Sequence, residues 1–241
     1  MQNKELEINF FDKFAEEADY DVFDTRGYER ILTELENKIP IDSNFNALDM
    51  GCGTGAFTVK LLKYQMNLSG VDLSPVSIKL AKKQNPSINF LVGDIENLEM
   101  FEDEKFDLII LSGVLHHFTD FSLVVSECYR LLRKGGYIFA YDPNIKNPFM
   151  FLYRAKKSPF YSSKGVTPNE QPISSQQIKD VFSRFNFNKV EICPISGVTY
   201  KYVESNLALY LLSIYNLIER LFDLPILRKK FGSFLVTVGK K

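Results

Sequence analysis

The amino-acid sequence predicts an α/β fold, a doubly wound, mostly parallel sheet with helices on both faces. From residue 46 onward, short apolar runs typical of strands alternate with amphipathic segments typical of helices, which indicates right-handed crossovers between parallel strands. A glycine-rich turn at residues 51–55 follows the first of these strands, where glycines let the backbone turn sharply and approach a ligand. The ligand is therefore expected beyond the carboxyl ends of the strands.

The individual elements follow from local pattern. Residues 5–38 alternate apolar and acidic residues at helical spacing, and a break near residues 24–27 divides them into two short helices laid against the core. Ser74 is a typical N-cap before Pro75, and the glycine pair at 135–136 is expected to end a helix. Strands are expected at residues 46–50, 68–73, 88–92, 106–111, 137–141, 189–193 and 233–238, with core helices at 56–64, 75–85, 119–134 and 175–185.

Two segments interrupt this pattern. Residues 143–174 contain five prolines and no clear period, which predicts a loop-rich lid. Residues 195–231 are expected to hold one long apolar helix between the last two strands. A length of 241 residues is compatible with a single domain. We therefore expect one domain with a helical N-terminal cover (1–45), a cofactor-binding core (46–142), a lid insertion (143–174) and a C-terminal core (175–241) containing the helical insertion (195–231).

Composition excludes several classes of protein. With 45% hydrophobic and 24% charged residues the chain is typical of globular proteins rather than disordered ones. Its three cysteines form no C-x-x-C pair, so neither a disulfide framework nor a metal site is predicted, and a cytoplasmic location is expected. The N-terminal segment is acidic, unlike a signal peptide. No transmembrane helix is expected, because the longest apolar stretch, residues 207–218, is shorter than the roughly 20 residues required.

The net charge of −1 conceals an asymmetry. Residues 1–120 carry 22 acidic and 11 basic side chains, whereas residues 121–241 carry 8 acidic and 18 basic ones. Residues 146–189 alone hold eight lysines and arginines, including Lys164, against two acids. This cluster favours an anionic acceptor, or else it is a solvated basic face.

Three acids follow three successive strands, namely Asp49, Asp72 and Asp94. The G-x-G-x-x-A spacing of residues 51–56 also fits a dinucleotide site with Asp72 as the ribose ligand. However, a carboxylate two residues before the first glycine would repel the pyrophosphate of NAD and attract the ammonium and sulfonium of S-adenosylmethionine. We expect Asp49 to face the methionine amine, Asp72 the ribose hydroxyls and Asp94 the adenine amino group.

The chain resembles the class I S-adenosylmethionine-dependent methyltransferases of the broad small-molecule, type 11-like family. The resemblance covers residues 46–142. It rests on five motifs in order: LDMGCGTG (48–55), GVDLSP (70–75), VGDIENL (92–98), FDLIILSGVLHHF (106–118) and LLRKGGYIFAYDPN (131–144).

This resemblance implies a Rossmann-like fold with seven strands and cap insertions after strands 5 and 6. It implies that the backbone at residues 112–113 borders the methionine part of the cofactor, that residues 73 and 95 flank the adenine, and that the N-terminal cover brings residues 26 and 28 near the cofactor. The expected cofactor-binding residues are Arg26, Tyr28, Asp49, Gly51, Cys52, Gly53, Gly55, Asp72, Leu73, Asp94, Ile95, Ser112 and Gly113.

Methyl transfer from a sulfonium is an in-line displacement that mainly requires alignment in a dry site, with a base where the acceptor loses a proton. The two histidines of the chain, His116 and His117, follow the fourth strand. Each is a candidate base or acceptor-orienting residue, with pocket lining or helix capping as the alternative. Residues 112–115 lack the Asn/Asp-Pro-Pro-aromatic motif of many base-modifying enzymes, which disfavours nucleic acid as the acceptor.

An apolar helix is expected at residues 203–223, with a stripe formed by Leu207, Leu211, Ile214, Ile218 and Leu221. The stripe can pack on the core, bind a lipid-like substrate, contact a membrane surface or join two subunits.

The sequence therefore predicts a methyltransferase that uses S-adenosylmethionine and forms S-adenosylhomocysteine. Its acceptor is expected to be a small molecule or a glycan, with anionic and lipid-linked acceptors as the options. The alternatives are an NAD-dependent oxidoreductase and a non-catalytic cofactor-binding protein.

Overall fold

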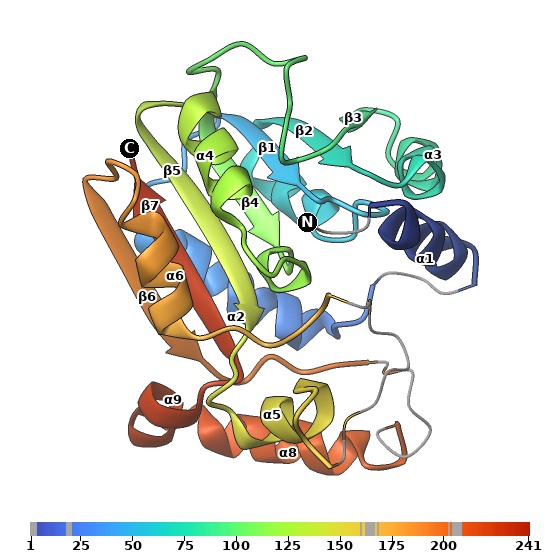
Figure 1. The fold of residues 1–241 in the computed structure, drawn as a ribbon, viewed down its shortest axis with the longest axis vertical. Helices are drawn as coiled ribbons and strands as arrows, with labels where there is room; N and C mark the ends of the chain where they lie inside the picture. Colours follow the sequence, from blue (N-terminus) through green and yellow to red (C-terminus); the bar gives the residue numbers. More distant parts are fainter. Residues whose placement is uncertain are drawn as a thin grey trace.

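The computed structural model describes residues 4–17, 21–159, 161, 167, 169–201, 203 and 209–241. Seven strands form one sheet in the order β3-β2-β1-β4-β5-β7-β6 (Figure 1). Its neighbours are parallel except around β7, which is antiparallel to β5 and to β6. The predicted mostly parallel, seven-stranded sheet is confirmed. The strands are β1 (Asn46–Met50), β2 (Asn67–Asp72), β3 (Asn89–Val92), β4 (Phe106–Ser112), β5 (Leu132–Pro143), β6 (Lys189–Ile195) and β7 (Phe234–Lys240).

Helices cover both faces of this sheet, as predicted (Figure 1). Side chains of β4 alternate between two cores: Leu108 and Ile110 pack in one, Ile109 and Leu111 in the other. The first core includes residues of α2 (Thr25–Lys38), the 3-10 helix η1 (Thr58–Tyr64) and α3 (Pro75–Gln84), and the second includes residues of α4 (Ser122–Leu131) and α6 (Ser175–Phe182). The remaining helices are α1 (Lys4–Glu17), the 3-10 helix η2 (Leu115–His117), α5 (Pro148–Arg154), α8 (Leu212–Phe222) and α9 (Pro225–Phe231).

The prediction that the glycine pair at 135–136 ends a helix is wrong. Helix α4 ends at Leu131, and β5 begins at the next residue. The pairing of β5 with β4 shifts in register opposite Phe106 and Leu108, and Gly135 there has a φ of 81°. The glycines therefore allow an irregularity in β5, because glycine adopts the left-handed conformation more readily than other residues do.

The long apolar helix expected at residues 203–223 is shorter in the structure. Helix α8 covers Leu212–Phe222 and ends near the predicted residue, but a turn at Leu211 separates it from the helical residues 209–210. A second helix that was not predicted, α9, begins at Pro225 after the extended backbone of Leu224. Leu207 and Lys164 lie outside the described residues.

Helix α1 and the three helices α5, α8 and α9, called the cap helices, lie near the carboxyl ends of the parallel strands. Helix α1 lies beside α3, whereas α5, α8 and α9 gather beyond the carboxyl end of β5 (Figure 1). Asp24 caps α2 by accepting from the backbone N–H of Gly27 at 2.8 Å, which explains the predicted break between the first two helices. Within the described part of the chain no helix is long and apolar enough to span a membrane.

Candidate active site

A cavity of about 290 Å³ lies where the carboxyl ends of β1, β2, β4 and β5 meet α1 and α5. Most residues predicted to bind a ligand line it. They are Tyr28, Gly51, Cys52, Gly53, Asp72, Leu73, Asp94, Ile95, Ser112, Gly113, His116 and His117. Arg26, Asp49 and Gly55 are not among its lining residues. Arg26 is exposed on the first turn of α2, so the expected contact of its side chain with a ligand in the cavity gains no support.

The glycine turn at the cavity wall requires glycine for steric reasons. Gly51 and Gly53 have φ values of 79° and 53°, and a Cβ on Gly51 would lie 2.7 Å from Cγ2 of Val114. Gly55 also has a positive φ, but its Cβ would meet the ring of Phe90 at 2.9 Å. Gly55 therefore allows close packing inside the core, whereas the first two glycines bring backbone to the cavity.

Asp72 holds this turn in place. Its Oδ2 accepts from the backbone N–H of Gly53 at 2.8 Å, and its Oδ1 accepts from that of Ser74 at 2.9 Å. Burial raises the pKa of Asp72, and these backbone donors oppose the rise. The carboxylate thus links the end of β2 to the glycine turn and faces the same cavity.

Asp49 is buried at the end of β1 with one unsatisfied oxygen. Its Oδ2 accepts from the hydroxyl of Thr58 at 2.7 Å, whereas its Oδ1 has no hydrogen-bond partner among the described residues. Burial raises the pKa of Asp49 to about 7, and the charge of Asp72 adds to the rise. A buried, unpaired acceptor is costly unless a ligand donates to it.

Helix α1 covers the cavity and is anchored by polar contacts. Lys4 forms ion pairs with Asp94 and, at 2.6 Å, with Glu96, and Asp12 accepts from the hydroxyl of Ser74. Three aromatic residues of α1 line the cavity: Phe10, Phe11 and Phe14. These rings were not predicted from the sequence, although the aromatic residues of the segment Asn9-Phe-Phe-Asp-Lys-Phe14 were a visible signal.

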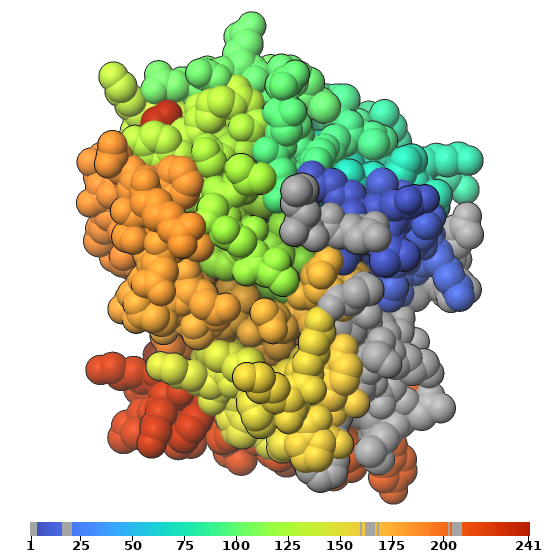
Figure 2. All heavy atoms as spheres, viewed as in Figure 1, coloured from blue at the N-terminus to red at the C-terminus, as the bar shows by residue number. Residues whose placement is uncertain are grey.

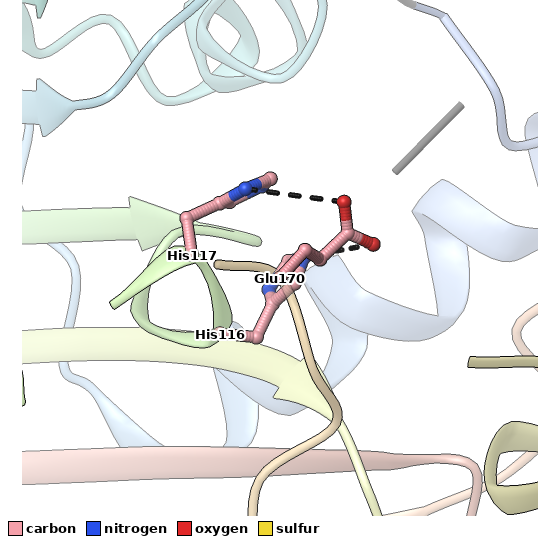
Figure 3. Close-up of side chains that lie close together, drawn as sticks. All are labelled: His116, His117 and Glu170. Atoms are coloured by element: carbon pink, nitrogen blue, oxygen red, sulfur yellow. Dashed lines mark ion pairs between the residues drawn. The ribbon is translucent and has the colours of Figure 1, made fainter. Parts of the chain in front are cut away.

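His116 and His117 line the cavity after β4, and His116 is oriented by a buried acid. Its Nδ1 lies 2.9 Å from Oδ1 of Asp142, which also accepts the backbone N–H of His116 at 3.1 Å. Burial raises the pKa of Asp142, and the hydrogen bond to His116 opposes the rise. With this carboxylate ionised, Nδ1 donates to it, and in the neutral ring Nε2 is the acceptor. This Nε2 lies 3.9 Å from Oε1 of Glu170 (Figure 3).

His117 lies in a different environment. Its Nδ1 is 3.3 Å from the hydroxyl of Thr167 and 3.9 Å from Oε2 of Glu170 (Figure 3). Burial lowers the pKa of His117 well below its usual value, and the positive charge of Arg154 adds to the effect. Its ring also meets the ring of Phe11 edge-on at 5.3 Å. His117 is therefore a neutral wall residue.

Residues 48–140 match the model of a protein family described as a methyltransferase domain. This part of the chain, residues 48–140, is therefore a methyltransferase domain. A phthiotriol/phenolphthiotriol dimycocerosates methyltransferase of Mycobacterium ulcerans is 34% identical over 119 residues, covering 48% of this chain and 42% of that protein. A ubiquinone biosynthesis O-methyltransferase of Coxiella burnetii is 32% identical over 126 residues, covering 51% of this chain and 53% of that protein. The chain thus spans about half the length of the curated relatives it matches.

Solved structures share the fold over nearly the whole chain. An S-adenosylmethionine-dependent methyltransferase of Thermotoga maritima, described as a possible histamine N-methyltransferase, has a TM-score of 0.66 at 20% identity and covers 97% of this chain and 99% of its own. A phosphoethanolamine N-methyltransferase of Haemonchus contortus with bound S-adenosylhomocysteine has a TM-score of 0.66 at 17% identity, covering 98% of this chain and 48% of its own. These likenesses confirm the predicted Rossmann-like fold.

Class I methyltransferase domains use S-adenosylmethionine, and the residues of this domain fit that molecule. Asp72 and Asp94, at the ends of β2 and β3, line the cavity and suit neutral hydroxyl and amino groups. Asp49 does not line the cavity, but its buried, unsatisfied Oδ1 at the neighbouring end of β1 suits a cationic donor. The same negative field would repel the phosphates of NAD. The oxidoreductase alternative therefore has no support from the site or from the comparisons.

Three further charged residues lie beside the histidines: Asp142, Arg154 and Glu170. Asp142 was not predicted, whereas Arg154 and Glu170 were noted in the sequence only as part of the charged segment 146–189. Asp142 is the next-to-last residue of β5, so the rule that selected acids near the ends of the first three strands would have found it. Arg154 and Glu170 come from the lid, where Arg154 Nη1 lies 3.0 Å from Glu170 Oε1. No local pattern in the sequence pointed to that pair, because the two residues are 16 positions apart in the chain.

The ligand atoms of His116, His117 and Glu170 lie within 4.8 Å of one another, close enough to hold a metal ion. The sequence analysis expected no metal site. In this arrangement the guanidinium of Arg154 already supplies positive charge to Glu170. A metal ion would have to compete with that cation.

Proposed function

We propose that the protein transfers the methyl group of S-adenosylmethionine to a small-molecule acceptor bound in the same cavity. One observation carries this proposal. The cavity joins the glycine turn and its acids at one end to His116, oriented by Asp142, at the other. A methyl donor and an acceptor bound at these two ends would be aligned in one largely buried space, and alignment supplies much of the acceleration in a displacement reaction.

The donor half binds the cofactor through backbone and carboxylate groups. Asp49 faces the methionine ammonium, Asp72 the ribose hydroxyls and Asp94 the adenine amino group, the last while paired to Lys4. Leu73 and Ile95 flank the adenine. Gly51, Cys52, Gly53, Ser112 and Gly113 provide backbone close to the ligand, and Tyr28 closes the side of α2. Burial raises the pKa of the Cys52 thiol well above its usual value, which supports a packing role rather than a nucleophilic one.

His116 acts as the general base. When bound, S-adenosylmethionine would supply the methyl group to the acceptor oxygen and would leave as S-adenosylhomocysteine. The acceptor proton passes to Nε2 of His116. Asp142 keeps Nδ1 protonated and stabilises the imidazolium that results. His117 stays neutral and shapes the wall.

The acceptor is a hydroxyl carried on an apolar, lipid-like molecule. Aromatic side chains of α1 and apolar groups such as Met150 and Phe234 form much of the wall. The names of the mycobacterial and ubiquinone-biosynthesis relatives point the same way. The basic lid adds little support for an anionic acceptor, because Arg154, which lines the cavity, is paired with Glu170.

Partners and location follow as finer proposals. Helix α8, the described part of the helix expected at residues 203–223, would contact a membrane surface or a second subunit. A cytoplasmic location is supported by three free cysteines, Cys52, Cys128 and Cys193.

Calorimetry with S-adenosylhomocysteine, S-adenosylmethionine and NAD tests the donor site. We expect the first two to bind and NAD not to bind. Turnover is then measured as transfer of a radiolabelled methyl group from S-adenosylmethionine to a lipophilic phenol extracted into an organic phase. Binding of NAD without S-adenosylhomocysteine would contradict the proposal, and binding without transfer to any hydroxyl acceptor would leave a non-catalytic binding protein.

A further inference from the structure

Helix α8 exposes an apolar stripe along its outer side. Ile214, Leu217 and Leu221 are 56%, 58% and 56% exposed, and their spacing of three and four residues places them on one side of the helix. Tyr210, which lies just before the helix, is 85% exposed. Leu224 and Ile226, 59% and 86% exposed, continue the apolar surface into α9. Together these six residues form the cap face: Tyr210, Ile214, Leu217, Leu221, Leu224 and Ile226. In Figure 2 the orange-red atoms of α8 and α9 form the lowest part of the molecule.

The inner side of the same helix is built into the protein. Glu219 is buried, and its Oε2 accepts from the hydroxyl of Ser233 at 2.7 Å and from the backbone N–H of Gly197 at 3.2 Å. The ring of Tyr215 contacts that of Phe149 in α5 with centroids 5.7 Å apart. Because polar and aromatic contacts fix the inner side, the cap face is the side that the fold leaves in water.

The inner side of α8 is also tied to the cavity. Asn216 accepts from the backbone N–H of Tyr200 at 3.0 Å and donates to its carbonyl at 2.8 Å. Tyr200 lines the cavity, as do Met150 and Arg154 of α5. Helices α5 and α8 thus lie between the cavity and the exposed apolar surface.

The exposed charges around the cap face have one sign. Within residues 209–231, Arg220, Lys229 and Lys230 are exposed. The two acids of this range do not offset them, because Glu219 is buried and Asp223 pairs with Arg228 at 3.3 Å. An apolar helix face flanked by exposed cations matches a bilayer surface that contains anionic lipid. A twofold dimer through the same face would bring the cations of both copies together at its rim.

We propose that the cap face docks the protein on a bilayer containing anionic phospholipid, so that a lipid-linked acceptor reaches the cavity from the membrane. The acceptor part of this inference rests on the proposed function, whereas the docking part does not. Docking would place the apolar cap residues in the interfacial region and Lys229 and Lys230 against lipid phosphates.

Flotation with two kinds of vesicle tests the inference. We expect the full chain to float with vesicles of equimolar phosphatidylglycerol and phosphatidylcholine and to float far less with phosphatidylcholine alone. The double variant Ile214→Glu, Leu217→Glu should lose flotation. The double variant Lys229→Gln, Lys230→Gln should weaken it by about fivefold for each lysine, the usual contribution of a basic residue near an anionic surface. Leu123→Glu, at a site 60% exposed on α4, is the matched control and should float like the wild type.

Circular dichroism and calorimetry with S-adenosylhomocysteine establish that each variant is folded, and calorimetry separates the two proposals because cofactor binding does not require docking. The inference is overturned if the wild type floats with neither vesicle, or if it floats equally well with both. It is also overturned if Ile214→Glu, Leu217→Glu floats normally, or if light scattering shows a dimer that this variant dissociates while the wild type does not float. That last outcome would assign the cap face to a second copy of the chain.

Discussion

The cavity has a donor half, at the glycine turn, and a cap half, at the histidines with Arg154 and Glu170. The two halves are built in opposite ways. The donor half uses backbone at strand ends: Gly51 and Gly53 supply positive φ angles, and Asp72 binds the turn through two backbone donors. The cap half uses side chains from distant segments, such as Arg154 and Glu170. Backbone geometry at parallel strand ends leaves few alternatives, whereas side-chain walls can change without disturbing the sheet. Cofactor binding and acceptor binding should therefore respond to separate mutations.

The largest expected effect is on the chemical step alone. His116→Ala removes the proposed base, so kcat should fall about 10²–10⁴-fold, the usual contribution of general base catalysis. Asp142→Asn should also lower kcat and change its pH profile, because the amide no longer selects the Nδ1–H tautomer. Calorimetry should find S-adenosylhomocysteine binding unchanged in both. Unchanged kcat in both variants would remove His116 from the mechanism.

The next effect is confined to the donor half. Gly51→Ala should weaken S-adenosylhomocysteine binding about thirtyfold or more, because the left-handed conformation costs about 1–2 kcal/mol and the new Cβ also meets Val114 at 2.7 Å. The turn then relaxes away from its shape at the cavity. Gly135→Ala is the matched control, since Gly135 has a similar φ of 81° but open space around its Cβ. Equal calorimetric affinities for the two variants would contradict the assignment of the turn.

A smaller effect depends on pH. Because burial raises the pKa of Asp49 to about 7, affinity for S-adenosylhomocysteine should rise about tenfold between about pH 6 and about pH 8, as the carboxylate that meets the ammonium ionises. Without ligand, stability should fall as pH rises from about 4 to about 7, because the native state holds a proton that the unfolded state has released. Asp49→Asn should remove the pH dependence of affinity in calorimetry and reduce that of stability in urea unfolding, where Glu219, whose pKa burial also raises to about 7, still contributes. A pH-independent wild type would refute this role.

The smallest effect concerns metal ions at the cap half. Treatment with EDTA should change turnover by less than about twofold, because Arg154 already neutralises Glu170 beside the two histidines. Loss of activity that zinc restores would show instead that the cluster is a metal centre. In that case the cap half of the cavity would bind a metal ion in addition to the acceptor.

Much of the donor half could be predicted because its signals are local. The acids at the ends of β1, β2 and β3 were found from sequence, since parallel strands bring their carboxyl ends to one edge. The same logic reached His116 and His117. It did not separate Gly51 and Gly53 from Gly55, because the neighbour that each glycine meets is set by packing. It also assigned the pair at 135–136 to a helix end, because a glycine signal is similar at a helix end and at a strand irregularity.

By itself, the sequence determined the mostly parallel sheet, the glycine turn, the acids around it and the domain family, because hydrophobic period and strand-end position are properties of neighbouring residues. Only the tertiary structure decided that Asp142 orients His116, that Arg154 pairs with Glu170, and that three phenylalanines of α1 close the cavity. It also decided which side of α8 is left exposed. These outcomes depend on contacts between segments far apart in the chain, and no local pattern specifies which distant side chain will fill a given space.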